Sequence, residues 1–271
     1  MRALVLAFLL GLCCATASAQ SWTGTWLSMV SETQSEQPHW VTPVVTVTPR
    51  LEQELRLDFD HEDISGGYTV WNLDGGKGVE VIPAKRIELI FNLPPYFTRN
   101  NPKTPGGWGD IAWLVKFRIA SGNEQHGNYI VTAFLAGSYD TGTYKNGARG
   151  PGITPTIAAG KGFGRFDVQS TLGILIPTAN TIKTGHQVAF NNALQYHVAH
   201  YFWPEVESNT TWFNGGDNKG QVQSFLTPGV NFGRFPIHNR IGLTLGIGEQ
   251  IAITHFDTYN HNLVLTARLP F

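Results

Sequence analysis

The sequence predicts an all-β fold, a single antiparallel transmembrane β-barrel of about twelve strands, with ten or fourteen strands as the alternative counts. Three observations predict it. The last residues, Asn260–Phe271, alternate between apolar and polar with a period of two, as a strand with one apolar face does. The chain starts with a segment typical of exported proteins. No later segment contains the roughly 18 consecutive apolar residues of a membrane-spanning helix, so only strands could cross a bilayer.

The first nineteen residues, Met1–Ala19, are predicted to be a cleaved secretory signal peptide. They contain a basic start at Arg2, an apolar run, and the small-residue sequence Ala17-Ser18-Ala19 before the predicted cleavage site. Cys13 and Cys14 are the two cysteines of the sequence, and both fall in this segment. The exported protein is therefore expected to lack disulfides and to depend on its hydrogen-bonded framework.

Composition narrows the class of protein further. Only 14% of the residues are charged, 12% are aromatic and 30 are glycine, which is a low charge content for a soluble chain of this length. No long stretch repeats with a helical period, so helical folds are not expected. The formal net charge of −1 predicts no nucleic-acid partner. Two classes remain, an exported soluble β-domain and a barrel in the outer membrane.

Three segments are predicted along the chain: the signal peptide at residues 1–19, a periplasmic lead-in at residues 20–50 and the barrel at residues 51–271. Two prolines, Pro43 and Pro49, make the end of the lead-in at most an approach to the first strand. The lead-in is too short to be a folded plug comparable to those of the larger hydrocarbon and fatty-acid channels.

Within the barrel, strands are predicted wherever apolar residues alternate with polar ones between turn residues. The connections alternate between short and long, as periplasmic turns and extracellular loops do. The predicted strands are Leu51–Asp60, Gly66–Leu73, Val79–Leu93, Gly109–Ile119, Tyr129–Ser138, Thr154–Gly162, Arg165–Ile176, His186–Phe202, a strand from about Glu205 to Phe213, Gln221–Arg234, Arg240–His255 and Asn260–Phe271.

The polar faces of these strands are predicted to line the lumen, because the apolar faces must meet lipid. Their charges are of both signs. Such an array can hold a narrow hydrated pore, or it can pair internally and fill the barrel. The lumen-lining candidates are Glu54, Arg56, Asp58, Arg86, Glu88, Lys116, Arg118, Arg165, Asp167, Glu205, Glu207 and Arg268.

The final strand resembles the closing strand of bacterial outer-membrane barrels. In those proteins a terminal aromatic residue and the apolar residues at alternate positions before it are recognised by the barrel-assembly machinery. By this resemblance the assembly signal consists of Leu263, Leu265, Leu269 and Phe271.

Three further sequences resemble a particular family. They are Gly107-Trp108-Gly109-Asp110 leading into Leu114–Arg118, Pro228–Gly233, and Tyr259-Asn260-His261. Together they are similar to outer-membrane transporters of the meta-pathway phenol-degradation family, over most of Leu51–Phe271. The resemblance implies a channel or transporter for small molecules, including aromatic or hydrophobic ones. It also implies a location in the outer membrane of a Gram-negative cell, with outer-membrane lipid, the barrel-assembly machinery and a small solute as partners.

Two other function classes remain open at this stage. An outer-membrane lipid-modifying enzyme would need a nucleophile beside a base, and His197, His200 and Ser208 are close in sequence. No nucleophile motif surrounds Ser208, and two histidines three residues apart on a strand face opposite sides. A non-conducting structural or periplasmic β-domain is the other class. We predict no enzyme activity, no catalytic residue, no metal site and no cofactor.

Overall fold

The structure is a computed structural model that describes residues 22–271 apart from residues 76, 145, 148 and 149. The predicted signal peptide therefore lies outside the described residues. Within them, fifteen strands form one antiparallel sheet. The strands are β1 (Glu54–Ile64), β2 (Tyr68–Leu73), β3 (Gly78–Ala84), β4 (Ile87–Asn92), β5 (Tyr96–Arg99), β6 (Gly107–Trp108), β7 (Ile111–Gly122), β8 (Tyr129–Tyr139), β9 (Gly152–Phe163), β10 (Phe166–Pro177), β11 (Gln187–Tyr196), β12 (Phe202–Phe213), β13 (Val222–His238), β14 (Ile241–Ala252) and β15 (His261–Pro270).

Six of these strands lie end to end in pairs, so the barrel wall contains twelve strands. β2 continues into β3, β4 into β5 and β6 into β7. Two backbone hydrogen bonds cross the breaks, from Leu93 N to Lys77 O at 2.7 Å and from Gly109 N to Pro95 O at 2.7 Å. Proline has no N–H to donate, so Pro94 and Pro95 interrupt the ladder where β4 ends.

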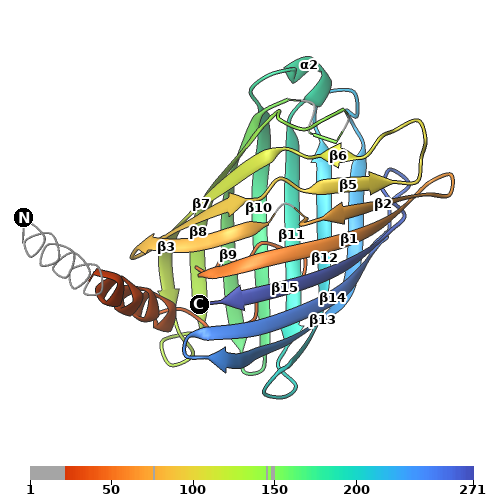
Figure 1. Ribbon diagram of the computed structural model, residues 1–271. Coiled ribbons are helices and arrows are strands. Elements are labelled where there is room, and N and C mark those ends of the chain that lie inside the picture. The colour runs from red at the N-terminus through yellow and green to blue at the C-terminus, as the bar shows by residue number, and fades with distance from the viewer. Residues whose placement is uncertain (1–21, 76, 145, 148–149) are drawn as a thin grey trace, which may run out of the picture.

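Pairing of β1 with β15 closes the sheet into a barrel (Figure 1). Their register runs from Glu54 opposite Pro270 to Asp63 opposite His261. We call the end where β1 begins and β15 finishes the terminal end. The opposite end, which carries the short helix α2 (Thr181–Thr184), is the loop end. The closed antiparallel barrel of twelve strands confirms the predicted fold class and the preferred strand count.

Two predicted strands extend through turns: His186–Phe202 continues past the end of β11 at Tyr196 to the start of β12 at Phe202, and Val79–Leu93 spans a turn as well. The sequence predicts a single strand over Val79–Leu93, whereas Lys85 and Arg86 form a turn between β3 and β4. Arg86 has a φ of +69° there, in the left-handed region, which is uncommon for residues other than glycine and occurs mainly in turns. The number of predicted strands is unaffected. The short strand predicted at Gly66–Leu73 corresponds to β2, and β2 and β3 together form one strand of the barrel wall.

Side chains alternate between the two faces of the wall, with the polar ones inside. On β15, Asn262 and Thr266 are each 3% exposed and face the interior. Leu263, Leu265 and Leu269 lie on the outward face. Their predicted role, with Phe271, as an assembly signal stays a prediction. A polar interior with an apolar exterior is the reverse of a soluble β-domain and is the arrangement of a transmembrane barrel.

The outer surface carries a continuous apolar belt, with side chains that are 37–58% exposed. It consists of Phe59, Phe91, Phe117, Leu135, Ile157, Leu172, Leu194, Val206, Leu226, Ile247 and Leu265. Aromatic pairs flank the belt: Phe202 and Phe232 near the terminal end, and Tyr96 and Trp108, with ring centroids 4.9 Å apart, near the loop end. An exposed apolar surface of this extent needs a nonaqueous environment, and aromatic girdles at both edges are typical of barrels that meet lipid.

The chain before β1 is divided between the outside and the inside of the barrel. Residues 22–35 form a helix at the terminal end. Trp26 Nε1 donates to the Ile82 carbonyl at 2.8 Å, and Val30 packs in a small core with Leu51 and Ile82. In the described part of the chain, no helix is both long enough and apolar enough to cross a bilayer.

Residues 40–53, which we call the lumen segment, then run inside the barrel. The sequence predicts most of this stretch as a lead-in outside the barrel, with no comparable folded plug. The structure instead buries much of the lumen segment: Val44 and Leu51 are 0% exposed, and Thr48 is 1% exposed. The interior charges therefore face a piece of the protein's own backbone.

Candidate functional site

The lumen segment forms a loop that is closed at its base. Thr42 Oγ1 donates to Glu52 Oε1 at 3.3 Å, and the guanidinium of Arg50 donates to the Trp40 carbonyl. Arg50 also pairs with Glu52 at 2.9 Å. These contacts hold the two ends of the loop together, so the chain enters the lumen and returns from it at neighbouring positions.

Two arginines bind carbonyl oxygens in the first half of this loop. Arg56 Nη2 donates to Val44 O at 2.5 Å, and Arg268 Nη2 donates to Pro43 O at 2.6 Å. Arg268 Nη1 donates to the Thr42 carbonyl as well. Guanidinium groups are suited to this because their donors are fixed in one plane. Three successive carbonyls that would otherwise be buried without partners are thereby satisfied.

Two glutamates of β12 bind the amides of the same stretch. Glu205 Oε1 accepts from Val44 N at 2.8 Å. Glu207 accepts from Val45 N at 2.8 Å and from Thr46 N at 2.6 Å, one bond at each carboxylate oxygen. Hydrogen bonds to an ionised acceptor are about twice as strong as neutral ones. The stretch from residue 42 to residue 46 is thus held by cations on its carbonyls and by anions on its amides.

The second half of the loop is bound by successive wall strands. Thr48 Oγ1 donates to Gln169 Oε1 on β10 at 2.7 Å, and Thr132 Oγ1 on β8 donates to the Pro49 carbonyl at 2.6 Å. Lys116 Nζ on β7 donates to the Arg50 carbonyl at 3.0 Å. The contacts therefore pass around the inner wall from β12 to β7 before the chain enters β1.

A fully buried ion pair supports the last of these contacts. Lys116 Nζ lies 2.9 Å from Glu88 Oε1, with the two side chains 1% and 0% exposed. Glu88 Oε2 accepts from Glu52 N at 2.5 Å. A buried pair stays stable only when its remaining hydrogen-bonding capacity is satisfied, and the lumen segment supplies part of that capacity here.

The loop is also anchored at the terminal end, outside the lumen. Glu124, in the turn between β7 and β8, accepts from His39 N at 2.7 Å and lies 2.8 Å from His39 Nδ1. Partial burial disfavours the charged form of Glu124, but these hydrogen bonds from His39 outweigh it and hold the pKa of Glu124 below its usual value. Arg118 Nη2 pairs with Glu36 at 2.7 Å nearby.

Ten of the twelve predicted lumen-lining residues point into the barrel. Glu54, Arg56, Asp58, Glu88, Lys116, Arg118, Asp167, Glu205, Glu207 and Arg268 are each at most 5% exposed. The other two, Arg86 and Arg165, are exposed in tight turns at the terminal end. They do not line the lumen, because Arg86 lies in the β3–β4 turn and Arg165 follows the turn at Gly164.

Several inward-facing charges were not among the candidates, Lys77 and Glu80 among them. Lys77 lies in the break between β2 and β3, and Glu80, 4% exposed, lies on β3. Glu80 lies eight residues before Glu88 and therefore on the same face of the predicted Val79–Leu93 strand, so the alternation of that strand could already have placed Glu80 on the inner face. The internal ion pairs Arg56–Asp58 and Lys116–Glu88, both at 2.9 Å, fit the filled-barrel alternative. Neither the open-pore nor the filled-barrel alternative includes the hydrogen bonds between these charged side chains and the backbone of the lumen segment.

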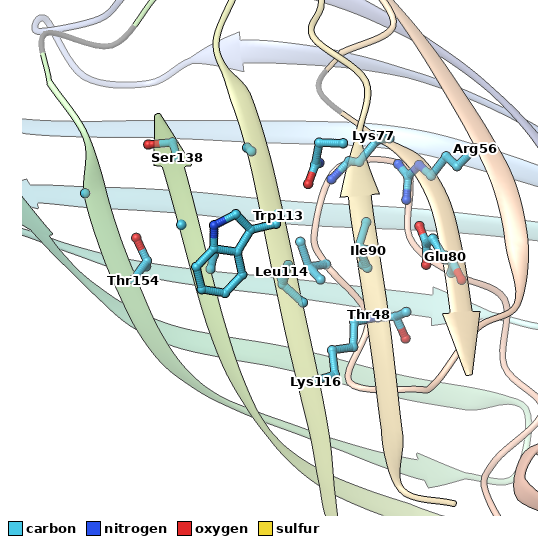
Figure 2. Close-up of a pocket in the computed structure, with 17 residues that line it drawn as sticks. Thr48, Arg56, Lys77, Glu80, Ile90, Trp113, Leu114, Lys116, Ser138 and Thr154 are labelled. Carbon is cyan, nitrogen blue, oxygen red and sulfur yellow. The ribbon is translucent and has the colours of Figure 1, made fainter. Parts of the chain in front are cut away.

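A cavity lies on each side of the lumen segment. The loop-side cavity has a volume of about 210 Å³ and extends from Arg56 and Lys116 to Ser138 (Figure 2). The terminal-side cavity has a volume of about 340 Å³ and is lined by Trp203 among others. Thr42 lines both cavities. The loop around Thr42 is therefore the partition between two chambers of the lumen.

The candidate enzyme residues do not form a catalytic pair in the part of the chain that the structure describes. Ser208 Oγ accepts from Asn192 Nδ2 at 3.4 Å. His197 and His200 lie after β11 rather than on a strand, so they do not face opposite sides of the wall, and both line the terminal-side cavity. His197 stacks on Trp203 with ring centroids 3.9 Å apart. An acyl-transfer site would need a histidine within hydrogen-bond reach of the serine, whereas the partner of Ser208 is Asn192.

Comparison with known proteins finds similarity at the level of fold. An outer-membrane channel from Pseudomonas putida F1 superposes with a TM-score of 0.58 at 16% sequence identity, over 86% of this chain and 100% of that chain. The NanC porin superposes with a TM-score of 0.54 at 11% identity, over 79% of this chain and 98% of that one. No family model and no curated protein sequence matches the chain. Membership of the meta-pathway family therefore stays a prediction.

Proposed function

We propose that this chain is an outer-membrane channel for small molecules. One observation carries the proposal: the barrel has an apolar belt outside and a polar lumen with a cavity on either side of the lumen segment. A filled structural barrel has no need of chambers on both sides of a loop. The predicted signal peptide and the two channel-like structures support the same location and role.

The lumen segment is the constriction in this proposal. It is bound to the wall mainly by hydrogen bonds, with Leu51 packed against Ile82 as an apolar contact, and each such hydrogen bond contributes about 0.5–3 kcal/mol. Its binding is therefore strong enough to keep it in place and weak enough for local displacement. Small solutes, aromatic or hydrophobic ones among them, would pass where the loop narrows the lumen.

Single-channel recording of the refolded full chain in a planar bilayer tests the proposal. A heat-dependent shift on a gel first establishes that the barrel is folded. We expect discrete conductance steps from the wild type, and larger steps from the double variant Glu205→Ala/Glu207→Ala, whose loop loses three backbone contacts. Folded protein that never conducts in either form, and that gives no solute uptake by liposomes, would overturn the proposal.

A further inference from the structure

The loop-side cavity has a charged wall and an apolar wall. Arg56, Lys77, Glu80 and Lys116 lie along β1, β3 and β7 and the break before β3. Figure 2 shows the side chains of Lys77 and Arg56 entering the cavity next to each other, with Glu80 beside Arg56. The apolar wall includes Ile90, Ala112, Leu114 and Ala136. A molecule bound here would meet positive charge at one end and hydrocarbon along its body.

The three cations of the cavity differ in their partners. Arg56 Nε lies 2.9 Å from Asp58 Oδ1, and Lys116 Nζ lies 2.9 Å from Glu88 Oε1. Among the described residues, no hydrogen bond or ion pair to a protein group is formed by the ammonium of Lys77. Asp58 and Glu80 act on it only from beyond ion-pair distance. Lys77 is half-buried, and a partly desolvated ammonium without a partner is costly, so an anion at this position would be stabilised.

The backbone holds Lys77 in place for such a role. Lys77 N donates to Asp74 O at 3.1 Å, and Lys77 O accepts from Leu93 N at 2.7 Å. The residue is therefore fixed at the break between β2 and β3 from both sides. Its side chain reaches the cavity because the wall bends there instead of continuing as a regular strand.

The volume of the loop-side cavity and the negative charge of Glu80 limit which ligands fit. A cavity of about 210 Å³ is below the range of about 300–1,000 Å³ for drug-sized ligands, and somewhat above the roughly 150 Å³ that holds one benzene ring. Glu80 would repel a second negative charge. The hydroxyl groups of Ser138 and Thr154 add hydrogen-bonding capacity for a single polar group.

From these features we infer that the loop-side cavity is a binding site for a small organic monoanion, a carboxylate on an apolar body the size of one ring, with Lys77 as the principal anion contact. The inference rests on the proposed channel function and names its substrate class. An anionic solute held here would sit directly on the loop side of the partition at Thr42.

Isothermal titration calorimetry of the refolded full chain in detergent tests the inference without requiring conduction. The probes are benzoate, benzyl alcohol, benzylamine and acetate. We expect benzoate to bind at least about tenfold more tightly than each of the other three, because only benzoate offers both the charge and the ring. Lys77→Gln should remove the preference for benzoate over benzyl alcohol, whereas Lys77→Arg should retain it.

A matched control is Lys219→Gln, which removes an exposed lysine from the β12–β13 loop and should leave benzoate affinity unchanged. Undetectable benzoate binding to folded wild type, or an unchanged preference in folded Lys77→Gln, would overturn the inference. Benzoate binding by a barrel that never conducts would overturn the channel proposal alone. Conduction without benzoate binding would overturn the site alone.

Discussion

Arg56 on β1 stands directly opposite Arg268 on β15 in the register that closes the barrel, and both guanidinium groups bind carbonyls of the lumen segment. Two like charges on neighbouring strands repel each other when they are directly opposed. Here they are tolerated because Asp58 pairs with Arg56 and because the backbone of residues 42–44 supplies acceptors for both side chains. The same two arginines therefore lie where β1 pairs with β15 to close the barrel and hold the lumen segment in place.

The first prediction concerns this seam. Arg268→Gln removes the hydrogen bonds to the carbonyls of Thr42 and Pro43. Loss of charge-assisted bonds of this kind should weaken docking of the loop by about 1.5–3 kcal/mol. We expect a higher mean conductance and more frequent transitions between conductance levels in single-channel recordings. The control is Arg165→Gln, which changes an exposed arginine in the β9–β10 turn; identical recordings from both variants would contradict the prediction.

The second prediction concerns the carboxylates on β12. Glu207→Ala leaves the amides of Val45 and Thr46 without their acceptors. We expect these two amides to exchange with solvent at least about tenfold faster, because their protection depends on local opening of the loop. Hydrogen exchange measured by mass spectrometry or NMR on the folded barrel gives the rates.

The matched control for that experiment is Glu249→Ala. Glu249 lies on the outer face of β14 beside His261 and is remote from the loop. Equal exchange at residues 45 and 46 in the two variants would show that Glu207 does not hold the lumen segment.

The strand pattern of this barrel could be predicted from sequence because each strand is constrained on both faces. Leu263 and Leu265 must meet an apolar environment while Asn262 and Arg268 must meet a polar one, so the period of two is strict. Ten of the twelve charge candidates follow the same constraint and are buried inside the barrel. The constraint fails at Arg86, which lies in a turn inside the predicted Val79–Leu93 strand, and at Arg165, which lies in the turn directly before β10 begins.

The lumen segment could not be predicted in the same way. Its conformation is set by side chains more than a hundred residues away, such as Glu205 and Glu207, which bind backbone atoms instead of side chains. Backbone N–H and C=O groups are present at nearly every residue, so a sequence pattern cannot show which of them are bound. The two prolines that suggest an approach to the first strand are equally compatible with an irregular loop inside the barrel.

The third prediction tests the placement of the loop directly. Asn209 Nδ2 donates to Thr46 Oγ1 at 3.2 Å across the lumen-facing side of β12. Paired cysteines at these two positions, Thr46→Cys and Asn209→Cys, should therefore form a disulfide on mild oxidation, detected as a change in gel mobility that a reductant reverses. The described residues contain no native cysteine to interfere. Thr46→Cys combined with Lys219→Cys, in the exposed β12–β13 loop, should stay reduced; equal crosslinking of both pairs would place the loop outside the lumen.

The fourth prediction concerns the outer belt. Leu172 is 45% exposed on the outward face of β10, and an arginine at the mid-height of a lipid-facing strand costs about 2–4 kcal/mol of folding stability. Leu172→Arg should lower the free energy of unfolding in lipid vesicles by that amount, measured by denaturant titration with tryptophan fluorescence. Ile182→Arg is the comparison, because Ile182 is 90% exposed in α2 at the loop end and should tolerate the charge in water. If both variants unfold at the same denaturant concentration as the wild type, the belt does not face lipid. A loss of stability confined to Leu172→Arg would instead show that the apolar surface is solvated by hydrocarbon in the folded state.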